Sequence, residues 1–219
     1  MIFAIRRNCL LFFTFKIKCG HIPIAFGRRL ALKFKTIFRE ILEVVLPALV
    51  LFLLLRTFVV EARYVPSPSM RPTIIEWDRF LVEKVSYRFR EPRRGDIIVF
   101  HPTEKANYLA NEQQGRQGEP VRLDDFIKRI VALPGETVEI AEGKVWINGV
   151  PLTEEYISPE RRPIYEFGPI TVGEDEYFVL GDNRNQSWDS HYWGTLPRKN
   201  IVGRAFWRFW PLKRIGPIR

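Results

Sequence analysis

Cysteine and histidine are scarce in this chain of 219 residues. The two cysteines, Cys9 and Cys19, lie near the N-terminus, and the three histidines, His21, His101 and His191, lie far apart. A disulfide framework needs cysteines spread through the domain, and a zinc site needs ligands at close spacing. We therefore expect neither a disulfide scaffold nor a metal site, and we expect no cofactor.

Negative charge is nearly absent from the first 40 residues. They contain nine Lys and Arg against one acid, Glu40, a net charge of +8, whereas the whole chain has a net charge of +9. The rest of the chain is therefore almost neutral. A nucleic-acid-binding domain carries a basic patch on its folded surface, so we expect no nucleic acid as a partner.

Residues 41–60 are one long apolar run, whose only charges are Glu43 and Arg56, near its two ends. As a helix this run spans about 30 Å, the thickness of the hydrocarbon core of a bilayer. Basic residues beside a span stay in the cytoplasm. We predict a basic cytoplasmic arm (residues 1–40), one transmembrane helix (41–60) and an extracytoplasmic β domain (61–219). A buried helix of a soluble protein and a cleaved signal peptide are the alternatives.

Short runs of β-branched and aromatic residues dominate residues 61–219, and Gly, Pro or Asn-Gly separates them. The clearest runs are residues 96–100, 126–133, 137–140, 144–147, 177–180 and 201–207. Asn148 and Gly149 are a hairpin turn signal. Because no amphipathic helical pattern alternates with the runs, we predict a mainly β, antiparallel, partly barrel-like domain. The polar residues 102–125 are predicted to form a surface loop.

Two of the six serines, Ser67 and Ser69, lie in the sequence VPSPSM at residues 65–70, shortly after the apolar run. Proline fixes φ and favours an extended residue before it, so this segment is predicted to be a stiff loop that holds two hydroxyls in set directions. At most about 30 Å of chain separates Ser69 from the apolar run. An ordinary linker is the alternative interpretation.

Lys128 lies in the apolar run FIKRIVAL, residues 126–133. In a strand it shares one face with Phe126 and Ile130. Apolar surroundings lower the pKa of a lysine because they desolvate its ammonium group, and the neutral amine can then act as a base. The neighbouring Arg129 cannot do so, since a guanidinium keeps its proton in proteins. A lysine that reaches out to solvent is the alternative interpretation.

Residues 181–194, GDNRNQSWDSHYWG, follow a predicted strand and are dense in hydrogen-bonding side chains. This composition is typical of a loop that holds other groups in place, and a simple cluster of turn residues is the alternative.

Together these segments resemble the bacterial type I signal peptidases, the membrane-bound serine proteases that remove signal peptides. VPSPSM is similar to the nucleophile motif of that family, and RRGDIIVF at residues 93–100 is similar to a structural motif. IKRIVALPGE and GDNRNQSWDSHYWG are similar to the lysine motif and to the last motif. Each motif alone is weak, but four motifs in family order behind an N-terminal apolar run are specific.

The resemblance implies roles for particular residues. Ser69 is implied to be the nucleophile and Lys128 the general base. The Ser67 hydroxyl and the Ser69 backbone N–H are implied to form an oxyanion hole. Ser187 is implied to orient the lysine amine, and the implied supporting residues are Asp182, Arg184 and Asp189.

One position departs from the family pattern. The family commonly has Arg where this chain has His191, which leaves the ion-pair partner of Asp189 open. Arg184 and Arg129 are the candidate replacements.

The implied function is that of a membrane-anchored serine endopeptidase that cuts exported preproteins after a small-x-small motif, by a Ser-Lys dyad and an acyl-enzyme. The implied location is the inner (plasma) membrane, and the implied partners are signal-peptide-bearing preproteins, the lipid bilayer and the secretion translocon. Two alternatives stay open at this point. One is a non-catalytic membrane-anchored domain for peptide binding or translocation assembly, and the other is a Ser-His-Asp hydrolase that uses His191.

Overall fold

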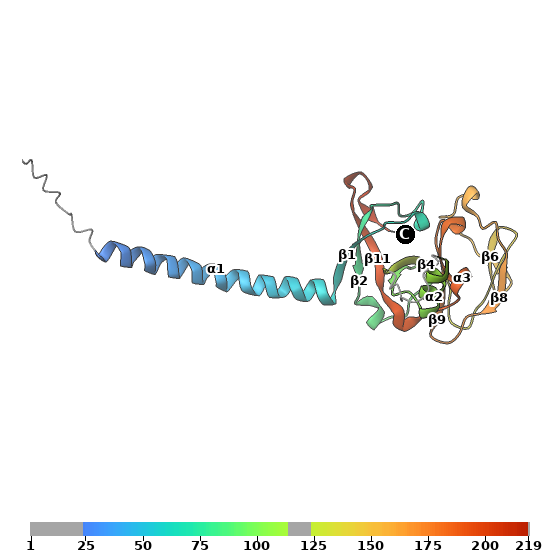
Figure 1. Ribbon diagram of the computed structural model, residues 1–219, viewed down its shortest axis with the longest axis horizontal. Coiled ribbons are helices and arrows are strands. Elements are labelled where there is room, and N and C mark those ends of the chain that lie inside the picture. The colour runs from blue at the N-terminus through green and yellow to red at the C-terminus, as the bar shows by residue number, and fades with distance from the viewer. Residues whose placement is uncertain (1–23, 114–123, 219) are drawn as a thin grey trace, which may run out of the picture. The chain divides into compact units, whose positions relative to one another are not determined.

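The computed structural model describes residues 24–113 and 124–218, and it includes side chains from residue 38 onward except those of residues 55, 57, 110, 111 and 113. The two cysteines and more than half of the predicted basic arm lie outside the described residues. The chain divides into two compact units, residues 1–50 and 51–219. Helix α1 covers Ile24–Phe58 (Figure 1).

Residues 41–58 are helical, as the sequence predicts. Among the residues described, no helix combines the length and the apolar character needed to cross a membrane. The transmembrane helix predicted over residues 41–60 is therefore not confirmed.

Beyond α1 the protein is mainly β, as predicted, and every strand pair is antiparallel. The larger sheet has the strand order β1-β2-β11-β3-β4-β9-β10, with β12 paired to β11, and it curls into a half-barrel (Figure 1). Its strands are β1 (Val60–Tyr64), β2 (Arg79–Glu83), β3 (Ile97–Phe100), β4 (Phe126–Ala132), β9 (Glu176–Leu180), β10 (Leu196–Pro197), β11 (Ile201–Trp210) and β12 (Gly216–Pro217).

The smaller sheet has the order β7-β6-β5-β8. Its strands are β5 (Thr137–Ala141), β6 (Lys144–Ile147), β7 (Val150–Pro151) and β8 (Phe167–Thr171). Strands β6 and β7 form the predicted hairpin, with Asn148 and Gly149 at φ values of 51° and 76° in its turn. Both values lie in the left-handed region that this two-residue turn requires.

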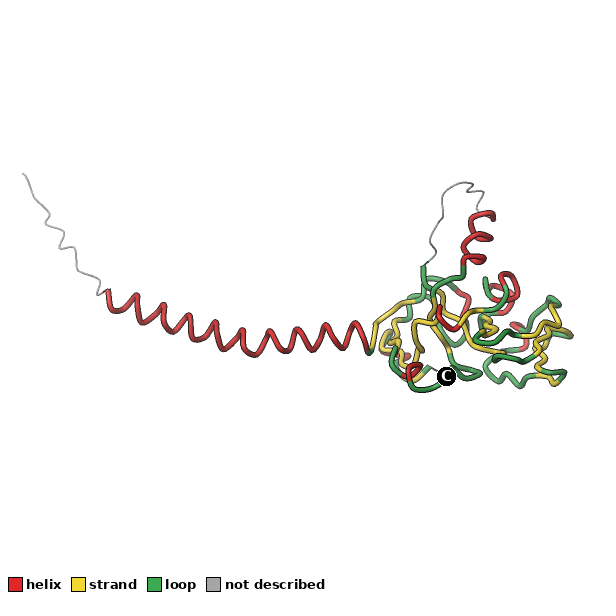
Figure 2. Tube along the Cα trace, turned by 90° about the horizontal axis from the view of Figure 1, so that it is seen from below, coloured by secondary structure: helices red, strands yellow, loops and turns green. Residues whose placement is uncertain are grey.

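Helices are short in the β domain, as the red segments of Figure 2 show. They are α2 (Glu104–Gln113), α3 (Ser190–Trp193) and the 3-10 turns η1 (Pro68–Met70), η2 (Ser86–Arg88), η3 (Pro159–Arg161), η4 (Arg184–Gln186), η5 (Arg198–Asn200) and η6 (Leu212–Arg214).

Helix α2 corrects the prediction that residues 102–125 are entirely loop. The Thr103 hydroxyl accepts a hydrogen bond from the backbone N–H of Ala106, which supports the first turn of the helix. Ala106 is fully buried and Leu109 packs against the same hydrophobic cluster, so one face of a mostly polar helix is covered. Residues 114–123 of the predicted loop lie outside the described residues.

Strand β4 joins the three hydrophobic clusters of the β domain. Ile127 belongs to the first cluster, Val131 and Ala132 to the second, and Ile130 to the third. A strand buried on both faces in this way has little freedom to shift, so the side chains it carries are held firmly.

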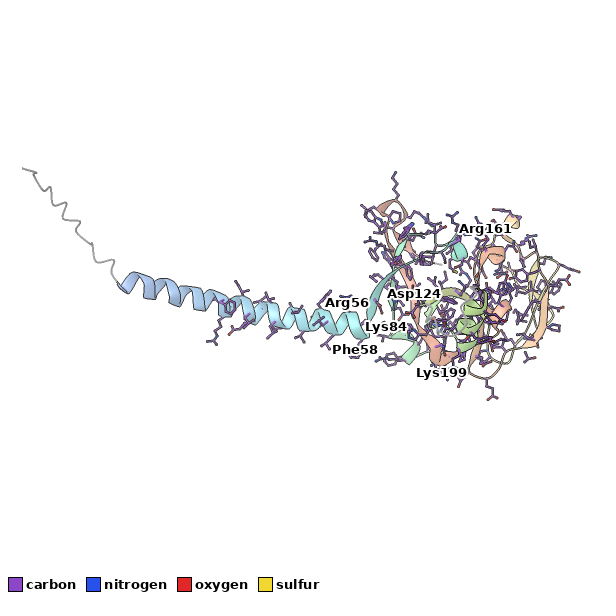
Figure 3. All side chains as sticks on the ribbon, in the orientation of Figure 1. Arg56, Phe58, Lys84, Asp124, Arg161 and Lys199 are labelled. Carbon is purple, nitrogen blue, oxygen red and sulfur yellow. The ribbon has the colours of Figure 1, made fainter. Side chains whose placement is uncertain are left out.

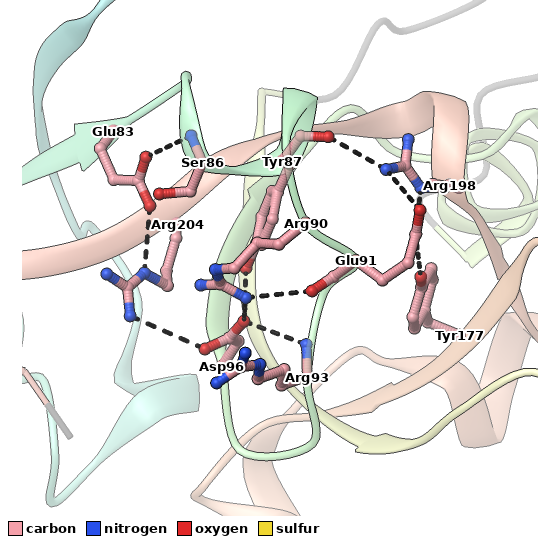
Figure 4. A network of polar contacts seen from close by, with 10 residues as sticks. All are labelled: Glu83, Ser86, Tyr87, Arg90, Glu91, Arg93, Asp96, Tyr177, Arg198 and Arg204. Carbon is pink, nitrogen blue, oxygen red and sulfur yellow. Dashed lines mark hydrogen bonds and ion pairs between the residues drawn. The ribbon is translucent and has the colours of Figure 1, made fainter.

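A polar network around Asp96 fixes the segment that leads into β3, which is the neighbour of β4 (Figure 4). The Asp96 carboxylate accepts hydrogen bonds from the Tyr87 hydroxyl, the Arg90 guanidinium and the Arg93 backbone N–H, at 3.0, 3.0 and 3.1 Å. Arg204 of β11 lies 3.9 Å from the same carboxylate. The network anchors the segment RRGDIIVF, which the sequence singled out as structural.

Candidate active site

Ser69 lies in the 3-10 turn η1, between β1 and β2, and its side chain is buried. The turn is tied to the segment that follows β9. The backbone N–H of Asn183 donates to the Ser69 carbonyl at 3.0 Å, and the Asn183 side chain donates to the Pro68 carbonyl at 3.1 Å. Met70, which is fully buried, anchors the other end of the turn in the core. The stiff loop that the prolines predict is therefore held from two sides.

Lys128 lies in the middle of β4, and its Nζ donates a hydrogen bond to the Ser69 hydroxyl at 2.9 Å. The side chain is only 4% exposed. Burial lowers the pKa of Lys128 to about 8, and the carboxylates of Asp189 and Asp182 act against this shift. The amine therefore loses its proton far more easily than an exposed lysine does. The structure thus brings together the two residues that the sequence predicts as nucleophile and base.

The Ser67 hydroxyl lies 3.2 Å from the Ser69 hydroxyl. Both open onto a pocket of about 500 Å³. Its lining residues are Arg63, Tyr64, Pro66, Ser67, Ser69, Phe80, Val99, Asp124 (labelled in Figure 3), Asp125, Phe126, Ile127, Lys128, Gln186 and Trp188. The walls are mainly apolar, and the polar groups of Ser67, Ser69 and Lys128 converge at one place, which is the usual arrangement of a substrate site.

Asp182 is fully buried and pairs with Arg129, the residue after Lys128 on β4. The guanidinium donates two hydrogen bonds to the two carboxylate oxygens, at 2.8 and 2.7 Å. The Thr73 hydroxyl donates a third, at 2.5 Å. This pair links the strand that carries Lys128 to the segment after β9, and Thr73 links both to the chain that follows η1.

Asp189 is also fully buried, and its partner is His191. Nδ1 of His191 lies 2.6 Å from one carboxylate oxygen, and the backbone N–H of Gly181 donates to the other at 2.9 Å. The suggestion that Arg184 or Arg129 pairs with Asp189 is therefore wrong. Arg129 forms an ion pair with Asp182, and Arg184 forms one with Glu154.

The bond that Ser187 is implied to make with the lysine amine is absent. The Ser187 hydroxyl is buried and has no hydrogen-bond partner among the described residues. It lies against Gly181, where the packing is very tight. A Cβ at Gly181 would come within 2.5 Å of the Ser69 backbone oxygen, so only glycine fits at this position.

Arg184 supports the site indirectly. Its guanidinium is fully buried, donates to the Gly181 carbonyl at 3.1 Å and forms a two-point ion pair with Glu154. The Tyr156 hydroxyl donates to the same carboxylate, and the guanidinium of Arg129 lies 3.8 Å from the centre of the Tyr156 ring. Sequence reasoning missed Glu154 and Tyr156, because nothing local in the sequence relates them to Arg184, 28 to 30 positions further on.

The His191 alternative lacks the contact it needs. Among the described residues the His191 side chain has a hydrogen bond to Asp189 and none to a serine, whereas the Ser69 hydroxyl bonds to Lys128. A Ser-His-Asp arrangement requires the imidazole to bond to the nucleophile.

A serine hydroxyl next to a buried amine, in an open and largely apolar pocket, is an arrangement typical of serine hydrolases. Comparison with known proteins gives the family. Residues 38–210 match the family model for signal peptidase, peptidase S26, and the chain belongs to this family.

Individual relatives agree with this assignment. The chain is 54% identical over 171 residues to a signal peptidase I of Leptolyngbya laminosa, which covers 78% of this chain and 79% of that protein. It is 49% identical over 179 residues to the probable signal peptidase I-2 of Synechocystis, covering 81% and 75%. It is 43% identical over 172 residues to the probable thylakoidal processing peptidase 2 of Arabidopsis thaliana, covering 78% and 44%.

Among solved structures, a signal peptidase I from Enterococcus faecalis is 33% identical, with a TM-score of 0.38, and covers 52% of this chain and 97% of that one. The prediction of an enzyme is confirmed by the family and its relatives. The chain is a serine endopeptidase of the signal peptidase I kind, its substrates are preproteins that carry signal peptides, and a non-catalytic binding domain is not supported.

Proposed function

We propose that this enzyme cuts exported preproteins after a small-x-small motif by means of a Ser69–Lys128 dyad. The observation that carries the proposal is the 2.9 Å contact between Lys128 Nζ and the Ser69 hydroxyl, made by an amine whose pKa burial lowers to about 8. A neutral amine at this distance is placed to take the hydroxyl proton. No histidine is needed.

The reaction proceeds in two halves. In the first, Lys128 takes the proton of Ser69 while the serine oxygen bonds to the scissile carbonyl carbon. The resulting oxyanion accepts hydrogen bonds from the Ser67 hydroxyl and the Ser69 backbone N–H. The C–N bond then breaks, the lysine proton passes to the leaving amine, and the signal peptide stays attached to Ser69 as an ester.

In the second half, Lys128 takes a proton from a water molecule that attacks the ester. The second tetrahedral intermediate collapses, the proton on Lys128 passes to the Ser69 oxygen, and the signal peptide leaves with a carboxylic acid group that loses its proton to water. Both serine and lysine end as they began.

The proposal includes a membrane anchor, with the basic arm in the cytoplasm and the β domain on the other side of the plasma membrane. Its support is the apolar run behind the basic arm, together with exposed apolar side chains on α1, among them Val44, Leu51 and Phe52 at 71, 57 and 56% exposure. Exposed apolar surface of this extent is covered in a native environment, and lipid covers it here.

Extraction of cell membranes with alkaline carbonate tests the anchor, because an anchored protein stays in the pellet. Recovery of the full chain in the soluble fraction contradicts it. The secretion translocon is a further proposed partner, and crosslinking in intact membranes is expected to join the two.

Incubation of the purified full chain with a preprotein that has Ala at positions −3 and −1 tests the chemistry. Wild type is expected to release the signal peptide at a single site, and Ser69→Ala and Lys128→Ala are expected to release none. Equal cleavage by wild type and both variants overturns the proposal. The pH profile is a second test. Activity is expected to rise through about pH 8, because the lysine must be neutral.

A further inference from the structure

The indole ring of Trp188 forms part of the pocket wall beside the dyad. Most lining residues come from β1 to β4 and from the segments between them, whereas Gln186 and Trp188 come from the segment after β9. Gln186 is exposed and Trp188 is half-buried. Trp188 is therefore the large, shielded side chain that this segment places in the pocket.

Ring stacking holds Trp188 in place. The indole stacks on Tyr192 at a ring distance of 4.5 Å and an angle of 19°. Tyr192 contacts His191 at 3.8 Å, and His191 stacks on Tyr165 at 4.1 Å and 18°. Four rings thus follow one another from the pocket to the chain before β8, and the hydrogen bond between His191 and the buried Asp189 fixes the middle of the row.

Trp188 relies on this packing for its orientation. Its indole Nε1 is buried and has no hydrogen-bond partner within the described part of the chain. The ring also packs against the hydrophobic cluster that contains Trp193 and Leu196. A ring held by both the stack and the cluster cannot swing away to admit a larger group without disturbing these contacts.

We propose that Trp188 is a specificity-determining residue, a rigid wall that limits the size of the preprotein side chain lying against it. The inference rests on the proposed function, since it concerns the same pocket. A wall of this kind rejects substrates by steric overlap, so the peptides that fit carry small side chains at the position facing the indole. The row of rings from Tyr192 to Tyr165 keeps the wall in place.

The test measures kcat/KM for a set of preproteins in which Ala is replaced by Leu or Phe at −3, −2, −1 or +1, one position at a time. Trp188→Ala is expected to raise the rate for the larger side chain, relative to the all-Ala preprotein, by about tenfold or more at one of these positions. Trp188→Phe is expected to give a smaller gain, and Tyr192→Leu, which loosens the stack, a gain between those of wild type and Trp188→Ala. Trp146→Ala, on β6 of the smaller sheet, is the matched control and is expected to keep the wild-type pattern.

Unchanged relative rates in Trp188→Ala and Trp188→Phe, with the all-Ala preprotein still cleaved, overturn this inference and leave the proposed function intact. The same holds if Trp188→Ala folds poorly and Trp188→Phe keeps the wild-type pattern at all four positions. Failure of wild type to cleave the all-Ala preprotein overturns the proposed function itself, and the inference with it.

Discussion

The two faces of β4 each carry a buried cation, and the protein treats the two in opposite ways. Lys128 and Arg129 are neighbours in the chain and are 4% and 2% exposed. Arg129 forms a two-point ion pair with the buried Asp182. Lys128 has no carboxylate within ion-pair distance in the described part of the chain, and its amine bonds to the hydroxyl of Ser69.

The difference lies in what burial does to each group. A guanidinium keeps its charge, so a buried arginine needs a carboxylate as counter-ion. A lysine without such a partner can lose its proton instead, and its pKa decreases. One strand thereby carries a permanent charge that holds the site together and, in the proposed mechanism, a removable proton for the chemistry.

The largest expected effect comes from making the two faces alike. Lys128→Arg puts a group that cannot become neutral next to Ser69, so preprotein cleavage is expected to decrease by about 10³-fold or more in a kcat/KM measurement. Lys199→Arg, at an exposed position labelled in Figure 3, is the control and is expected to behave as wild type. Activity of Lys128→Arg within tenfold of wild type contradicts a lysine base.

Removing the cation from the other face of β4 tests whether Arg129 stabilises the folded protein. Arg129→Met leaves the Asp182 carboxylate buried without a counter-ion, and this is expected to lower the free energy of unfolding by about 3–5 kcal/mol in urea titrations. Arg88→Met, at an exposed position, is expected to change it by less than about 0.5 kcal/mol.

The double variant Arg129→Met, Asp182→Leu removes the stranded carboxylate and is expected to recover most of that loss. A loss of the same size in the double variant shows that packing around Arg129, and not its charge, is the cause.

Two features could be predicted because their signals are local in the sequence. Apolar neighbours on both sides of Lys128 indicate that the lysine is buried in its strand, and Asn148-Gly149 indicates the hairpin of β6 and β7. Helix α2 was missed since most of its residues are polar, and its single covered face becomes evident only when Ala106 meets the core.

The ion-pair partner of Arg184 could not be predicted from the sequence. Glu154 lies 30 positions away in the chain, and the path of residues 154–166 decides that the two side chains meet. Opposite charges at such separations in the chain have many possible partners. The position of Trp188 in the pocket wall is unpredictable for the same reason.

A smaller effect concerns the free-energy cost of burying the charged amine of Lys128. Burial lowers the pKa of Lys128 from 10.5 to about 8, so folding releases its proton between these two pH values. Burying the protonated amine lowers the free energy of unfolding by its full amount below about pH 8. This cost decreases as the pH rises and vanishes above about pH 10.5.

Lys128→Met removes this cost and is expected to stabilise the protein by about 3 kcal/mol at pH 7 in urea titrations. The gain over wild type is expected to be much smaller at pH 10. A gain of equal size at both pH values contradicts a lysine that becomes neutral on folding.

The smallest expected effect distinguishes the two buried carboxylates. Asp189 and Asp182 both raise the pKa of Lys128 against the dominant effect of burial, with the larger contribution from Asp189. Removing one negative charge therefore lowers the pKa of the amine, and the rise of kcat/KM with pH moves to lower pH. Asp189→Asn is expected to move it further than Asp182→Asn, because Arg129 lies against Asp182 and offsets its charge at the lysine. If the rise of kcat/KM moves by the same number of pH units in both variants, and both have wild-type circular dichroism, this difference between the faces of β4 is contradicted.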